Sequence, residues 1–183
     1  MSVIDLIPVS LYGVDEEKLE RFYLELPQLV SDLYEDVEYQ VALFSIKSGE
    51  ILENLRIADE LSAYSPYAWP EDIVMEVTMA VGTIKYPDVG LLEHLLTLDD
   101  VDATRISTWM HFISNVYPIY SAKACSTLDA MAIPTPYRPD DIASYGLYIS
   151  RIEGLKLHAP ATGMPEIGLP RARVLQIALE RFK

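Results

Sequence analysis

The chain has 183 residues, half of them hydrophobic and 23% charged, which is the composition of a folded globular protein and not of a disordered one. Its 28 acidic and 14 basic side chains give a net charge of −14, and such a charge repels the phosphates of nucleic acids. The single cysteine, Cys125, excludes a disulfide and a cysteine-ligated iron–sulfur cluster within one chain.

The length fits one domain, and we expect residues 1–183 to form a single helical domain. No stretch approaches about 18 consecutive apolar residues, so we expect no membrane contact. The opening segment MSVIDLIPVS lacks the basic start and long apolar core of a secretory signal, which favours a cytoplasmic protein. The sequence leaves the oligomeric state open.

In the first part of the chain, the spacing of apolar residues predicts a series of helices. Residues 15–26 carry a capping aspartate, acidic residues in the first turn and apolar side chains three and four positions apart. Pro27 suits the first turn of a second helix, over 27–37. Residues 38–47 fit a short buried strand or a buried helix, and their helical neighbours favour the helix. A further amphipathic helix is predicted over 49–62.

A loop rich in proline and aromatic residues, YSPYAWP at 64–70, interrupts this helical pattern. The sequence after it predicts a series of helices separated by short loops, over 71–82, within 86–98, and over 103–114, 121–131, 140–152 and 169–182. Strand signals are few and no internal repeat is present. The predicted fold class is therefore all-α.

The charge is distributed unevenly along the chain. Residues 1–100 hold five basic and 21 acidic side chains, a net of −16, whereas residues 101–183 hold nine basic and seven acidic ones, a net of +2. The segments DEEKLE and SDLYEDVE place acidic residues along predicted helices, which permits a face of regularly spaced negative charge. Such a face can occupy a DNA-binding groove by imitating the phosphate backbone, although acidic residues more commonly form a solvated surface.

The segment LLTLDDVDATRISTWMHFIS, residues 95–114, has the pattern of a helix end, a short turn and a second helix. It resembles the hairpin of the helix-hairpin-helix DNA glycosylase superfamily, in which L-x-G-V-G-x-x-x-A lies between two helices. Leu98 and Val101 match the apolar positions of that pattern. Asp100 and Asp102 stand where the family has its two glycines.

A second match follows the hairpin. The segment YPIYSAK resembles the family's proline-containing loop, with Pro118 and Ile119 matching. Ser121, or Tyr120 with one gap, stands where the family has an aspartate. The resemblance covers about residues 86–130 directly, and the all-helical layout extends it loosely over the rest of the chain.

The substitutions at the glycine positions bear on DNA binding. In such hairpins, glycines bring bare backbone amides against a phosphate. Aspartate tolerates a positive φ, so the turn can survive, but the carboxylates of Asp99, Asp100 and Asp102 oppose an anion. A simpler interpretation is that Asp100 or Asp102 caps the following helix. Thr104 and Arg105, directly after the turn, are further candidates for contact with a nucleic acid or a partner.

The resemblance also implies a loss of catalytic groups. Glycosylases of this family extrude a base, use an aspartate to support attack at the sugar and, in bifunctional members, use a hairpin lysine as nucleophile. The lysine position falls at or beside Thr104, which cannot form a Schiff base. A divergent active enzyme would have to recruit other side chains, for which the candidates are Lys123, Ser121 and Asp129, with Asp140 and Asp141 as further carboxylates. Lys123 is equally explained as a solvated residue on a helix face.

Two other groups are candidates for binding. Tyr64, Tyr67 and Trp69 could stack on a flipped base or anchor a protein partner, or they could simply pack their loop onto the helices. Arg171 and Arg173, at the start of the last predicted helix, could contact phosphate.

Nothing in the sequence indicates a metal site or a cofactor. The histidines and the cysteine lack the i, i+4 spacing of a helical metal site and are better explained as core or boundary residues: His94, His111, His158 and Cys125. No phosphate-binding glycine loop or dinucleotide fingerprint occurs, so we expect no cofactor.

Together these observations predict a glycosylase-like helical protein that is catalytically inactive and binds DNA or a protein partner in a DNA-related process. One alternative is an acidic protein that imitates DNA and inhibits a DNA-binding protein through its N-terminal half. The other is a divergent, active base-excision enzyme.

Overall fold

The computed structural model describes residues 11–35, 37–41, 50–62, 64–65, 67–82, 87–114, 116–160 and 164–183. Within these ranges the regular structure is entirely helical, which confirms the all-α prediction. The elements are α1 (Glu16–Leu29), the 3-10 helix η1 (Ser31–Glu35), α3 (Ile51–Leu61), α4 (Glu71–Gly82), α5 (Val89–Leu95), α6 (Ala103–Ser114), α7 (Ala122–Ala130), α8 (Ile142–His158) and α9 (Arg171–Arg181). Among these described helices, none has the length and hydropathy needed to cross a bilayer.

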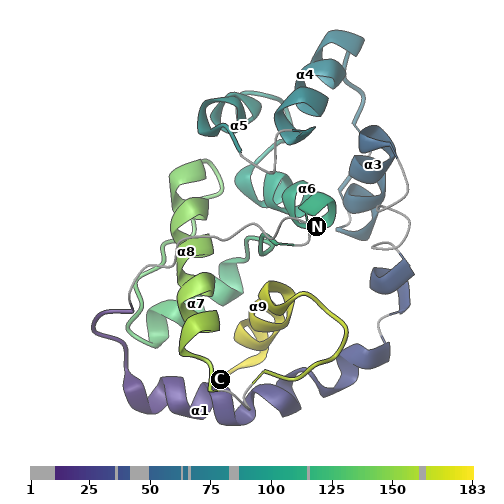
Figure 1. The fold of residues 1–183 in the computed structure, drawn as a ribbon. Coiled ribbons are helices and arrows are strands. Elements are labelled where there is room, and N and C mark those ends of the chain that lie inside the picture. The colour runs from purple at the N-terminus through teal and green to yellow at the C-terminus, as the bar shows by residue number, and fades with distance from the viewer. Residues whose placement is uncertain are drawn as a thin grey trace.

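Helix α9 lies in the lower half of the view, with α7 and α8 beside it and α1 along the lower edge (Figure 1). It buries six consecutive side chains, from Val174 to Leu179, because neighbouring helices cover it on several sides. Helices α3, α4, α5 and α6 form the other end of the molecule, where α3 packs on α6 and α5 leads through a short turn into α6.

Side-chain caps fix the starts of several helices. Asp15 accepts the Lys18 amide at the start of α1, and Ser121 accepts the Ala124 amide at the start of α7. Asp88 and Asp141 cap α5 and α8 in the same way. The predicted helix starts at Asp15 and Ser121 are thereby confirmed.

The predicted break at Pro27 is wrong, because α1 continues through this proline to Leu29. Pro27 lies on the exposed side of the helix, although its missing N–H removes one hydrogen bond of the helix. On the opposite side, Leu26 and Val30 are fully buried and hold the segment against the core. Of the ambiguous segment 38–47, residues 38–41 are helical, and the remainder lies outside the described residues.

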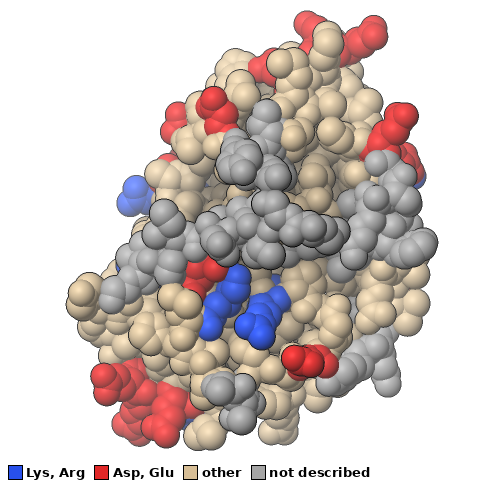
Figure 2. All heavy atoms as spheres, in the orientation of Figure 1, with Lys and Arg blue, Asp and Glu red and all other residues tan. Residues whose placement is uncertain are grey.

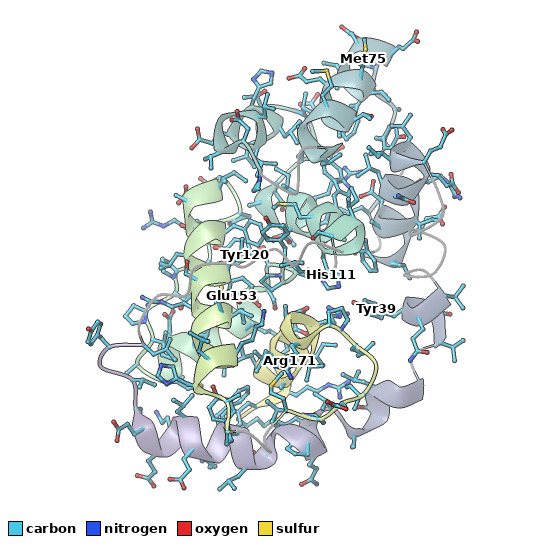
Figure 3. The ribbon with its side chains drawn as sticks, viewed as in Figure 1. Tyr39, Met75, His111, Tyr120, Glu153 and Arg171 are labelled. Carbon is cyan, nitrogen blue, oxygen red and sulfur yellow. The ribbon has the colours of Figure 1, made fainter. Side chains whose placement is uncertain are left out.

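A buried polar network joins the helical residues 37–41 to α6. The ring of His111 is fully buried, and its Nδ1 lies 2.6 Å from the Tyr117 carbonyl oxygen. Because a carbonyl can only accept, Nδ1 carries the proton, and Nε2 therefore accepts from the Tyr39 hydroxyl. Figure 3 shows Tyr39 and His111 directed toward each other near α9.

Candidate functional site at the helix hairpin

The turn between α5 and α6 keeps the backbone of a tight hairpin without a glycine. Asp100 has a φ of +61°, in the left-handed region that glycine usually occupies. The Val101 amide donates to the Leu98 carbonyl at 3.3 Å, and the Val101 side chain is buried. The prediction that aspartate can hold this turn is confirmed.

Asp102 caps α6. Its Oδ1 accepts the Arg105 amide at 2.7 Å, and its carbonyl accepts the Ile106 amide at 3.0 Å. The Ala103 amide donates to the Pro139 carbonyl at 2.7 Å. The Ala103 and Arg105 amides at the start of α6 thus already have acceptors within the protein. The capping interpretation is confirmed for Asp102.

Arg105 is turned into the protein and is only 2% exposed. Its Nη2 and Nε donate to the two carboxylate oxygens of Asp59, at 2.7 and 3.2 Å. Nη1 donates to the Asp100 carbonyl at 2.9 Å, and Nη2 also donates to the Ser65 carbonyl at 3.0 Å. The Arg105 charge is therefore neutralised by the Asp59 carboxylate of α3. The guanidinium also stabilises the turn from the buried side through its hydrogen bond to the Asp100 carbonyl.

The aromatic loop packs against the same guanidinium. The rings of Tyr67 and Trp69 are stacked, with centroids 4.7 Å apart, and Trp69 meets Trp109 edge-on at 6.0 Å. The Arg105 guanidinium carbon lies 5.2 Å from the centroid of Tyr64 and 5.5 Å from that of Trp69. These contacts support the interpretation that the loop is packed onto the helical body, although Tyr64, Tyr67 and Trp69 each keep a partly exposed edge.

A pocket of about 490 Å³ opens at the hairpin, lined by Tyr64, Ser65, Asp100, Val101, Asp102 and Arg105. Four side chains that the sequence selected as contact candidates thus share one site. Burial, with the negative charge of Asp102, raises the pKa of Tyr64 to about 12, so its phenol stays protonated at neutral pH. Thr104 does not line the pocket, and its hydroxyl is hydrogen-bonded to that of Tyr137 at 2.7 Å.

The catalytic candidates lie elsewhere, and three of the five have structural partners. Ser121 caps α7, and an Asp129 carboxylate oxygen accepts the Thr135 amide at 2.6 Å. Asp141 caps α8, whereas Asp140 and Lys123 are exposed. None of the five lines the hairpin pocket. The catalytic candidates of the sequence are therefore not brought together at this site.

The basic pair of α9 also lies apart from the hairpin pocket. Arg171 is exposed at the start of α9, and Figure 3 places it in the central part of the molecule. Arg173 donates from Nη1 to Gln176 Oε1 at 2.6 Å, and its guanidinium carbon lies 5.3 Å from the ring centroid of Tyr39. Figure 2 shows basic side chains in the middle of this face, with acidic ones concentrated toward its edges.

Asp59 is a site residue that was not predicted from the sequence. Its position next to Ala58, on the apolar side of α3, could have identified it. A carboxylate at such a position is buried, and a buried carboxylate requires a cation or several hydrogen-bond donors. Asp59 also accepts the Trp109 indole N–H at 2.7 Å, so it joins the guanidinium and the aromatic cluster.

The described residues contain no group of three or more histidine, cysteine or acidic side chains placed to hold a metal ion. Comparisons of the chain with protein-family models, with curated proteins and with solved structures found no match.

Proposed function

We propose that this protein is a non-catalytic binding protein that recognises a basic, DNA-binding protein partner, and that its hairpin pocket accepts a cationic side chain of that partner. The observation that carries the proposal is the charge balance of the pocket. The guanidinium of Arg105 is neutralised by Asp59, so the carboxylates of Asp100 and Asp102 leave the pocket with a negative charge.

A DNA phosphate fits this pocket poorly. A glycosylase-type hairpin binds phosphate with free amides, and here the Arg105 and Ala103 amides are already bonded to Asp102 and Pro139. An incoming phosphate would also meet two carboxylates. An ammonium or guanidinium group, by contrast, gains from both carboxylates.

The likeness to helix-hairpin-helix glycosylases belongs to this proposal. The left-handed Asp100 and the buried Val101 support a hairpin of that kind whose phosphate-binding function has been replaced. None of the catalytic candidates of the sequence lines the described pocket, and this supports a binding role over base excision. The net charge of −14 would accelerate encounter with a basic partner.

Fluorescence anisotropy with two kinds of probe tests the proposal. A labelled arginine–glycine repeat peptide represents the basic partner, and labelled single- and double-stranded DNA represent the competing ligand. Between about 20 and 200 mM salt, we expect peptide binding that weakens with salt and no binding of either DNA.

The variant Asp100→Gly/Asp102→Asn removes both charges while glycine keeps the left-handed turn and asparagine keeps the cap. It should weaken peptide binding by about fivefold or more, whereas Glu71→Gln/Asp72→Asn on α4, with the same charge change, should alter it less than about twofold. Salt-sensitive DNA binding by the unmodified protein, or equal effects of the two variants on peptide binding, would overturn the proposal.

A further inference from the structure

A second concave surface lies on the opposite end of the molecule from the hairpin. Helix α1 and the segment that ends α8 enclose a groove of about 580 Å³, lined by Glu16, Leu19, Glu20, Tyr23, Leu24, Pro27, His158 and Pro160. The residues from α1 form two neighbouring rows along the helix, since each row repeats at every fourth position. One row is Leu19, Tyr23 and Pro27, and the other is Glu16, Glu20 and Leu24.

The apolar row forms a rigid floor. Tyr23 is only 7% exposed, and its hydroxyl donates to the Leu155 carbonyl at 2.6 Å, which fixes the ring against α8. Leu19 is partly buried and packs against the core. At the rim, Leu24 is 75% exposed, so an occupant of the groove would remove a large apolar side chain from water.

On α1, the basic side chains contact the rest of the protein, whereas Glu16 and Glu20 line the groove. Lys18 donates from Nζ to the Ala130 carbonyl at 2.7 Å, and Arg21 donates to the Lys183 carbonyl with its guanidinium carbon 4.7 Å from the Phe182 ring centroid. Both cations of α1 are thus held against the protein body. Within the described part of the chain, Glu16 and Glu20 have no ion pair, and their carboxylates remain at the groove. Figure 2 shows the resulting concentration of acidic side chains at the lower left, over the beginning of α1.

We propose that this groove binds an amphipathic basic helix of the partner protein. Its apolar side chains would contact the row of Leu19, Tyr23 and Pro27, and its lysines or arginines would pair with Glu16 and Glu20. The distance from Glu16 to Pro27 corresponds to about 17 Å of helix, which matches about three turns of a ligand helix. The inference rests on the proposed function in one respect, since both require a basic protein partner.

The charge distribution argues for this occupant over a second copy of the chain. Two copies that met through this groove would bring Glu16 and Glu20 of each chain together, and each copy carries a net charge of −14. A basic helix instead offers opposite charge together with the apolar face that Leu24 and Tyr23 require.

Peptide titrations test the groove directly. The probe is a labelled lysine–leucine peptide of about 14 residues with its leucines on one helical face. One control peptide has the same composition with the leucines redistributed around the helix, and a second has glutamate in place of lysine. We expect the probe to bind at least about fivefold more tightly than either control.

Three variants locate the binding. Leu24→Ser should weaken probe binding by about fivefold, and Glu16→Gln/Glu20→Gln by about tenfold with a shallower salt dependence. Glu71→Gln/Asp72→Asn, the remote charge-matched control, should change it less than about twofold, and thermal unfolding verifies that each variant is folded. Equal binding of the redistributed peptide, or unchanged binding by both groove variants, would refute the inference. Sedimentation that shows a dimer lost in Leu24→Ser would assign the groove to a second copy and refute it as well.

The two proposals fail separately. If only the groove inference is wrong, Asp100→Gly/Asp102→Asn still weakens binding of the arginine–glycine peptide while Leu24→Ser leaves the lysine–leucine peptide unaffected. If only the hairpin proposal is wrong, the pattern reverses.

Discussion

Arg105 and Asp59 form an ion pair from which water is almost completely excluded, with side chains 3% and 2% exposed. The two residues lie 46 positions apart and join α6 to α3 directly beneath the hairpin. Because of this pair, the Arg105 guanidinium points into the protein. The charged groups that remain at the surface of the pocket are the carboxylates of Asp100 and Asp102. The charge of this site is therefore decided by a residue on another helix.

Replacing Asp59 by alanine should destabilise the protein by about 3–5 kcal/mol, because it leaves the buried guanidinium of Arg105 uncompensated and removes the acceptor of the Trp109 indole. Urea unfolding followed by circular dichroism measures the loss. The double variant Asp59→Leu/Arg105→Met should recover part of it, since no buried charge then remains. A loss below about 1 kcal/mol in Asp59→Ala would contradict the structural importance of the pair.

Asp100 should respond to substitution in a way that depends on its left-handed backbone. At a φ of +61°, alanine is strained and glycine is not, so Asp100→Gly should be more stable than Asp100→Ala by about 1 kcal/mol. Thermal unfolding of the two variants under identical conditions gives the difference. In an ordinary helix position alanine would be the more stable residue, and that order would rule out the hairpin turn described here.

His111 should make the stability depend on pH between 7 and 5. Burial lowers its pKa from 6.5 to about 4, the Arg173 charge acts in the same direction, and the hydrogen bond to Tyr117 opposes both. The His111 ring therefore binds a proton near pH 6.5 in the unfolded chain, but only near pH 4 in the folded protein. Stability is complete above pH 6.5 and falls as the pH is lowered, by about 2 kcal/mol between pH 7 and pH 5.

Urea titrations at several pH values measure this dependence, and His111→Phe should flatten it. The matched control is His158→Gln, which replaces an exposed histidine. The lowered pKa values of Asp32, Glu53 and Asp141 act below about pH 4.5 and so do not interfere in this window. A slope that persists in His111→Phe would show that other groups cause it.

Cys125 should be unreactive in the folded protein. The thiol is 1% exposed, and burial, with the negative charge of Asp129, raises its pKa to about 12. A thiol reagent such as dithionitrobenzoate at pH 8 should label it at least about a thousandfold more slowly in buffer than in urea, because labelling requires unfolding. Rapid stoichiometric labelling in buffer would show that α7 opens locally.

Local signals predicted much of this fold. The caps at Asp15 and Ser121 and the extents of α4 and α6 followed from residues adjacent in sequence, because capping and helical periodicity are local effects. The end of α1 was not predictable in this way. Its continuation through Pro27 depends on the burial of Leu26 and Val30, and thus on packing partners distant in sequence.

The candidate site was likewise predictable from the sequence only in part. The sequence identified Asp100, Asp102 and Tyr64, and the structure places them in one pocket. The sequence could not show that Arg105 faces inward, because an arginine that follows a hairpin turn is equally consistent with a phosphate ligand. That orientation depends on Asp59, and no spacing rule links residues 46 positions apart.

The hydrogen bond from Tyr23 to Leu155 has a consequence for the order of folding. It joins residues 132 positions apart, so it can form only after a long stretch of chain has been brought together, at a considerable cost in chain entropy. The floor of the α1 groove is therefore completed late, after α8 has docked. A newly made or partly unfolded chain would not present the groove, and its capture of a ligand would report that α8 has docked against α1.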